Sequence, residues 1–299
     1  MGPMHGKSAN WRRFSPVARI LAAAVIGLIL GLAVLMGFLW TQLESKFIFF
    51  PTRELEFNPS HAALAYEDVA FVTEKGRMLH GWFIPGTSGG HGITWLWLHG
   101  NGGNISHRVE DLAMIHHRLG VHILIFDYQG YGRSEGKPTE KGTYQDARAA
   151  VEYLVNKPDV DPEKIVYFGR SLGSAVAVNL AVEKPPLGLV LVSPFSSLED
   201  MARLSYPFLP VGWLTRGRYD SISQIPSVKR PVLIVHGLLD ETVPVAQGMK
   251  LFDAANEPKR FQALPAAAHN DTQSRGGSGY WNSLERFMAD LAKDEFPRN

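Results

Sequence analysis

The segment from Ile165 to Ala181, IVYFGRSLGSAVAVNLA, decides the fold. Its first four residues form an apolar run that predicts a buried strand, and the small and aliphatic residues after Gly173 predict a helix. A Gly-x-Ser-x-Gly turn between a strand and a helix is typical of a nucleophilic serine, because the tight turn strains the serine backbone and holds its hydroxyl clear of the sheet. Side chains at Gly169 and Gly173 would collide with the flanking elements. We therefore predict that Ser171 is a nucleophile.

Predicted strands and helices alternate on both sides of this turn. Apolar runs predict strands at residues 66–73, 78–84, 93–98, 122–126, 164–168, 187–192, 232–235 and 260–264. Amphipathic runs predict helices at residues 105–119, 139–157, 245–255 and 280–293. This alternation predicts an α/β fold in which helices cover both faces of a mostly parallel central sheet.

Residues 195–225 interrupt the alternation and are rich in proline and apolar side chains. The apolar residues are Met201, Leu204, Tyr206, Phe208, Leu209, Val211, Trp213 and Leu214. We interpret this segment as a small cap over the serine, which favours a substrate with an acyl or otherwise apolar group. The alternative is an insertion that packs only for stability.

The chain order of the acid and the histidine selects the partners of the serine. In proteins with this serine turn, an Asp or Glu and then a His follow the nucleophile. His236 leads directly into the loop of Asp240, so the order leaves His269 as the base. Asp240 follows a strand end, where the acid belongs, whereas Asp220 near the end of the cap remains a weaker alternative. Two further candidates fall in the cap and inside a predicted helix: Asp200 and Asp253.

A glycine-rich loop, His99-Gly100-Asn101-Gly102-Gly103-Asn104, follows the predicted strand 93–98. Its glycines let the main chain approach a substrate carbonyl, so we predict an oxyanion hole from the N–H of Leu172 and an N–H of the Asn101–Gly102 turn. By itself the loop would also fit a phosphate-binding loop or a plain turn. Its place ahead of the serine turn favours the oxyanion hole. This chemistry needs neither a metal nor an organic cofactor.

Four motifs together resemble one known group of proteins. They are His99-Gly100-Asn101-x-Gly103-Asn104, Asp127-Tyr128-x-Gly130-Tyr131-Gly132-x-Ser134-x-Gly136, Gly169-Arg170-Ser171-Leu172-Gly173 and His236-Gly237-x-x-Asp240-x-x-Val243-Pro244. With Phe50-Pro51-Thr52-Arg53 and Ser193-Pro194-Phe195-Ser196-Ser197, they resemble the membrane-anchored α/β-hydrolases of the serine-aminopeptidase-like branch. The resemblance covers nearly everything from Phe47 onwards. It implies the α/β-hydrolase fold and a serine hydrolase with Ser171, Asp240 and His269 as its triad, but it does not imply peptidase activity.

Composition excludes several other classes. The 299 residues carry a formal net charge of +1 without charge blocks, so there is no electrostatic case for binding nucleic acid. The chain has no cysteine, which excludes disulfides and thiolate metal sites.

The N-terminal region predicts a membrane anchor. Residues 20–40 are uncharged and long enough, as a helix, to cross about 30 Å of hydrocarbon. Four basic residues precede them: Lys7, Arg12, Arg13 and Arg19. By the positive-inside rule the N-terminus is cytoplasmic and the catalytic domain extracytoplasmic, in a bacterium periplasmic. A cleaved signal peptide is the alternative, although the run is long and lacks a small-x-small cleavage site.

The expected organisation therefore has four parts. These are a cytoplasmic segment at 1–19, a single-pass anchor at 20–40, a juxtamembrane connector at 41–60 and a hydrolase domain at 61–299 with its cap at about 195–225.

The expected function is a membrane-anchored serine hydrolase that cleaves carboxylic esters, with a small-molecule or lipid-like acyl substrate. A thioesterase that removes acyl groups from proteins is one alternative. A serine aminopeptidase is another, for which Glu199 or Asp200 would bind the free amine. A non-catalytic scaffold is less favoured, because the triad and the oxyanion loop are all present.

Overall fold

The structure is a computed structural model that describes residues 15–206, 208, 215, 218–293 and 296, without the side chains of 33 and 36–47. The chain divides into two compact units, Met1–Ile48 and Phe49–Asn299. In the first unit the described residues form one helix, α1 (Pro16–Ile48). The connector residues 49–60 belong to the second unit.

The predicted membrane span at residues 20–40 is not confirmed. Among the residues that the structure describes, no helix combines the length and the apolar character that crossing a bilayer requires. Part of the predicted span, residues 33 and 36–40, has side chains outside this description.

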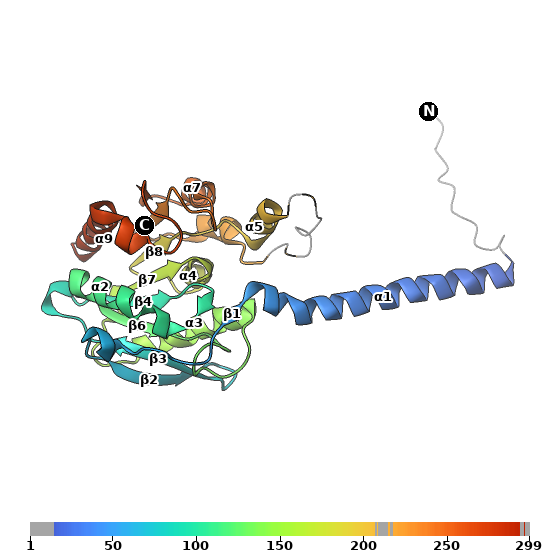
Figure 1. The fold of residues 1–299 in the computed structure, drawn as a ribbon, viewed down its shortest axis with the longest axis horizontal. Coiled ribbons are helices and arrows are strands. Elements are labelled where there is room, and N and C mark those ends of the chain that lie inside the picture. The colour runs from blue at the N-terminus through green and yellow to red at the C-terminus, as the bar shows by residue number, and fades with distance from the viewer. Residues whose placement is uncertain (1–14, 207, 209–214, 216–217, 294–295, 297–299) are drawn as a thin grey trace, which may run out of the picture. The chain divides into compact units, whose positions relative to one another are not determined.

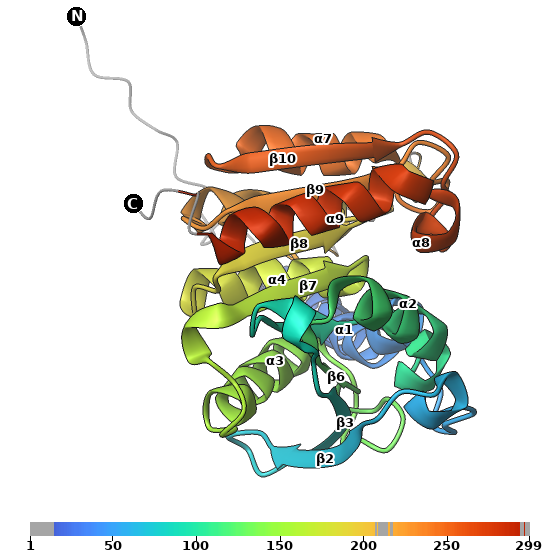
Figure 2. The same ribbon diagram turned by 90° about the vertical axis from the view of Figure 1, so that its left-hand side faces the viewer.

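The second unit is built on an eight-stranded sheet (Figures 1 and 2). Along the sheet the strands follow the order β10-β9-β8-β7-β4-β6-β3-β2. Six neighbouring strands, β6, β4, β7, β8, β9 and β10, run parallel. β3 is antiparallel to both β2 and β6. Their bounds are β2 (Glu67–Val72), β3 (Met78–Ile84), β4 (Thr94–Leu98), β6 (His122–Phe126), β7 (Ile165–Arg170), β8 (Gly188–Val192), β9 (Val232–Gly237) and β10 (Lys259–Leu264). The predicted mostly parallel sheet is thus confirmed.

Helices cover both faces of the sheet, as predicted (Figure 2). One face packs against α2 (Val109–Leu119) and α9 (Gly277–Ala292), and in its core the ring of Phe168 stacks on Trp95 and meets Trp97 edge-on. The other face carries α3 (Glu140–Val155), α4 (Leu172–Glu183) and α7 (Val245–Ala254). Nine of the twelve residues of α4 are buried, because its alanines and valines let this central helix lie directly on the sheet.

The predicted helix at 105–119 begins with a 3₁₀ turn, Ile105–Arg108, before α2. A second difference is a short parallel pair, β1 (Phe50–Pro51) with β5 (Gly102–Gly103), which joins the connector to the glycine-rich loop. Two residues a side leave no periodic pattern from which this pair could be predicted.

The predicted cap is described only in part. Its described helices are α5 (Leu198–Ser205) and the short α6 (Ser221–Gln224). Leu204, Tyr206 and Phe208 are exposed. The predicted cap residues Leu209, Val211, Trp213 and Leu214 lie outside the described residues.

Candidate active site

Ser171 occupies the sharp turn between β7 and α4. Its backbone has φ 51° and ψ −118°, a left-handed conformation that a side chain rarely adopts. A Cβ on Gly173 would lie 1.9 Å from the carbonyl oxygen of Leu98 in β4, and one on Gly169 would lie 2.6 Å from that of Gly173. The two glycines therefore let α4 press against the strand ends while the serine remains at the top of the turn.

The loops after two other strands bring the predicted acid and base to this serine. His269 Nε2 lies 3.1 Å from Ser171 Oγ, and its Nδ1 lies 2.7 Å from Asp240 Oδ2. Asp240 follows β9, whereas His269 lies between β10 and α8 (Thr272–Arg275). The structure thus brings together the three predicted residues: Ser171 from the serine turn, His269 from chain order and Asp240 from its place after a strand end.

The environment of Asp240 favours its ionised form. Burial alone would raise the pKa of this carboxyl, but hydrogen bonds from His236, His269 and the N–H of Val243 outweigh burial and hold the pKa well below its usual value. Oδ1 accepts the N–H groups of Thr242 and Val243 at 3.0 and 2.7 Å. The carboxylate is therefore fixed and charged opposite the imidazole. The weaker candidate, Asp220, instead caps α6 by accepting the N–H of Ser223 at 3.4 Å.

The glycine-rich loop lies beside the serine. A Cβ on Gly100 would lie 3.5 Å from Ser171 Cβ, an ordinary van der Waals contact, so the loop passes directly beside the serine. The side chain of Asn101 anchors the loop, since its Oδ1 accepts the N–H of Phe50 at 3.3 Å and the hydroxyl of Tyr131 at 3.0 Å. Arg108 donates to the carbonyl of Gly102 at 2.6 Å. Leu172, the other predicted contributor, is the first residue of α4.

Two buried residues, His99 and Asp127, support the glycine-rich loop. His99 donates from Nδ1 to the carbonyl of Gly100 at 2.7 Å, and burial lowers the pKa of this histidine to about 3. Asp127 accepts the N–H of Ile105 at 3.0 Å, and burial raises the pKa of its carboxyl from 3.8 to about 7. Asp127 thus anchors the loop.

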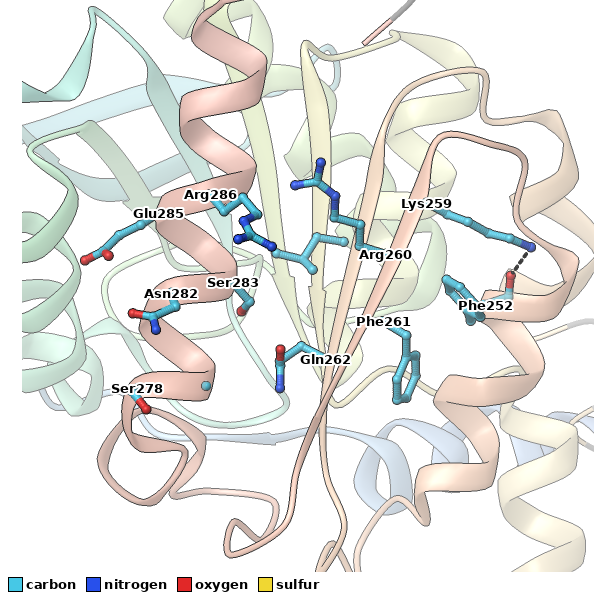
Figure 3. Close-up of a pocket in the computed structure, with 12 residues that line it drawn as sticks. Phe252, Lys259, Arg260, Phe261, Gln262, Ser278, Asn282, Ser283, Glu285 and Arg286 are labelled. Carbon is cyan, nitrogen blue, oxygen red and sulfur yellow. Dashed lines mark hydrogen bonds between the residues drawn. The ribbon is translucent and has the colours of Figure 1, made fainter. Parts of the chain in front are cut away.

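The hollows outside the triad include two larger ones. One of about 550 Å³ is lined by residues that include Arg108 and Asp111, together with Arg170 and Asn270, the sequence neighbours of Ser171 and His269. Another of about 810 Å³ opens between the edge strand β10 and α9, lined by residues such as Gln262, Asn282 and Arg286 (Figure 3). No triad residue lines either of these two hollows. Among the described residues, no group of three or more His, Asp or Glu side chains could hold a metal ion.

Sequence reasoning missed two structural features of the site. The first is the pairing of the connector with the oxyanion loop, and the second is the role of Arg170, whose guanidinium reaches the segment of His269. The position of Arg170 directly before the serine was the only available signal.

A parallel sheet, a serine turn after β7 and a Ser–His–Asp arrangement define the α/β-hydrolases. Within them the chain belongs to the prolyl oligopeptidase family (Peptidase_S9), which matches residues 120–293. The narrower resemblance to the membrane-anchored, serine-aminopeptidase-like branch remains a prediction.

Similar proteins come from bacteria, plants and archaea. The chain is 42% identical to the Mycobacterium tuberculosis protein Rv2307c over 94% of this chain and 96% of that protein. It is 33% identical to the Arabidopsis thaliana alpha/beta hydrolase domain-containing protein WAV2, over 89% and 92% of the two chains. The solved structure of the Pyrococcus furiosus esterase Pf2001 matches with a TM-score of 0.67 at 23% identity, covering 82% of this chain and 97% of that one. At that identity the likeness concerns the fold alone.

Proposed function

We propose that this hydrolase is a serine esterase that cleaves carboxylic esters with acyl or lipid-like groups, through Ser171, His269 and Asp240. One observation carries the proposal: the imidazole of His269 bridges Ser171 Oγ and a charged, buried Asp240. A histidine held in this way is a general base for the serine hydroxyl.

The proposed mechanism follows from these contacts. Ser171 Oγ attacks the ester carbonyl while His269 Nε2 takes the hydroxyl proton, and His269 then gives that proton to the leaving alcohol. Water hydrolyses the acyl-enzyme by the same two transfers. Asp240 holds the imidazole with its proton on Nδ1 and stabilises the imidazolium. The N–H of Leu172 and an N–H of the Asn101–Gly102 turn would receive the oxyanion, and losing one such donor typically costs about 3 kcal/mol.

The contacts of the cap acids argue against an aminopeptidase. Glu199 pairs with Arg203, and Asp200 is bonded to both Lys250 and Ser196. A free substrate amine would have to displace these partners. A thioesterase uses the same triad, so the acyl-transfer chemistry alone does not separate it from an esterase.

The membrane anchor and the extracytoplasmic site also belong to this proposal. Their support is the sequence: the uncharged run at 20–40 and the basic residues before it.

The test uses the full-length protein with Ser171→Ala as its control. A fluorophosphonate probe reports an activated serine, and p-nitrophenyl esters, acyl thioesters and aminoacyl p-nitroanilides compare the three reaction types. We expect labelling and ester hydrolysis that the substitution abolishes. Preferential cleavage of the anilides would overturn the ester proposal, and an unlabelled, folded wild-type protein would overturn the triad.

A further inference from the structure

Arg170 joins three segments around the active site. It is the last residue of β7, directly before the serine, and it is only 5% exposed. Its Nη1 donates to Asp111 Oδ2 in α2 at 3.0 Å and lies 3.4 Å from Gln273 Oε1 in α8. Its Nη2 donates to the backbone carbonyl of His269 at 3.1 Å. One side chain therefore connects the serine strand, a sheet-covering helix and the histidine segment.

We infer that Arg170 is a positioning residue, whose buried guanidinium holds the main chain of His269 where the imidazole reaches Ser171. This inference rests on the proposed function. Ser171 and His269 are 98 positions apart, so their 3.1 Å contact depends on how two separate segments are held. Arg170 directly precedes Ser171 and holds the segment of His269 through its backbone carbonyl. Because a misplacement of about 1 Å can cost on the order of 100-fold in rate, such a restraint bears directly on catalysis.

The geometry requires an arginine with an acidic partner. A guanidinium donates along several fixed directions in one plane, whereas an ammonium is a compact point charge. Asp111 supplies the compensating charge. Burial raises the pKa of the Asp111 carboxyl, while Arg170 and Arg108 act to lower it. Removing Arg170 alone would leave this partly buried carboxyl without its ion-pair partner, so the protein would lose stability as well as alignment.

A purely structural ion pair would predict a different pattern of effects. It would make activity follow stability in every variant. A positioning role predicts that activity and stability separate when the Asp111 carboxylate is removed together with Arg170: stability recovers but activity does not.

The experiment compares full-length variants in ester hydrolysis, fluorophosphonate labelling rate and melting temperature. We expect Arg170→Met to lower kcat by about 10- to 100-fold with a much smaller change in KM. Arg170→Lys should restore part of this loss. The double variant Arg170→Met/Asp111→Leu should regain melting temperature but not kcat. Arg260→Met breaks the Arg260–Asp290 pair at the edge of the sheet, and as a control should lower the melting temperature without lowering kcat.

A second readout does not depend on the substrate. In the wild type, the proton between His269 Nδ1 and Asp240 should give a far-downfield proton resonance, identified by its absence in His269→Asn. We expect this signal to broaden or vanish in the double variant. A retained signal, or a kcat that recovers together with the melting temperature, would overturn the inference. A wild type without labelling would instead overturn the proposed function, and the resonance would still decide the role of Arg170.

Discussion

Asp240 Oδ2 lies 2.7 Å from His269 Nδ1, while Oδ1 of the same carboxylate accepts two backbone N–H groups. The two oxygens therefore have different roles: Oδ1 fixes the carboxylate to the backbone, and Oδ2 orients the imidazole of His269. His236 also approaches Oδ2, at 3.4 Å, and donates to the carbonyl of Val243 at 2.8 Å. The loop after β9 is thus built to hold one charged oxygen toward His269.

Asp240→Asn should remove activity while keeping the fold. The amide keeps the shape of the carboxylate, but its NH₂ can favour the wrong imidazole tautomer. We expect kcat to fall by about 10³- to 10⁴-fold, with little change in KM. The measurement is ester hydrolysis, beside Glu241→Asn as the control at the neighbouring, exposed position. Activity within tenfold of wild type would exclude Asp240 as the acid.

Gly173→Ala should prevent α4 from reaching its place on the sheet. The new Cβ would lie 1.9 Å from the backbone oxygen of Leu98, which cannot move without shifting β4. We expect a loss of about 3 kcal/mol or more in unfolding free energy, measured by denaturant unfolding. Gly89→Ala is the control, because its Cβ would meet only Thr87 Oγ1 at 3.7 Å. Equal stability of the two variants would show that the turn tolerates a side chain.

The residues that could be predicted are those with a local signature. The serine turn can be recognised from five residues, and buried strands such as Gly188–Val192 are continuous apolar runs. Chain order then selected His269, and the position after a strand end favoured Asp240; the structure places these two residues in contact.

The residues that could not be predicted act over long sequence separations. Phe50 in the connector pairs with Gly102 in the glycine-rich loop. Arg170 forms hydrogen bonds with Asp111, 59 positions away, and with His269, 99 positions away. No pattern within one segment reports such contacts, because they depend on where the sheet places its loops. The sequence already favoured Asp240 over Asp220, and the fold adds that Asp220 caps a short helix.

Asp127 should make stability depend on pH. The native pKa of its buried carboxyl is about 7, above the usual 3.8, so the native protein binds this proton more tightly than the unfolded chain does. The contribution of Asp127 to the unfolding free energy should therefore fall as pH rises from about 4 to about 7, and it should be constant above that window.

Asp127→Asn removes this titration. We expect the unfolding free energy of the wild type minus that of the variant to fall by about 1.4 kcal/mol for each pH unit inside the window. Asp146, whose pKa burial also raises to about 7, is present in both proteins and cancels. Denaturant unfolding from pH 4.5 to 8 measures the slope, with the exposed Asp253→Asn as control. A difference that does not vary with pH would show that Asp127 is ionised throughout.

The pairing of β1 with β5 predicts that the connector supports catalysis as well as linking two units. The N–H of Thr52 donates to the carbonyl of Gly103 at 3.1 Å, and the N–H of Phe50 donates to Asn101 Oδ1 at 3.3 Å. These bonds hold the loop that we propose as part of the oxyanion hole.

Thr52→Pro removes the first of these donors and should loosen that loop. Loss of a whole oxyanion donor costs on the order of 100-fold or more in kcat, so a displaced loop should cost about 10-fold, with KM nearly unchanged. Thr52→Ala is the matched control, because it keeps the N–H and removes only the side chain that Asn104 contacts at 2.9 Å. The measurement is kcat together with the fluorophosphonate labelling rate. If Thr52→Pro lowers the melting temperature but hydrolyses esters at the wild-type rate, the connector stabilises the fold without organising the site.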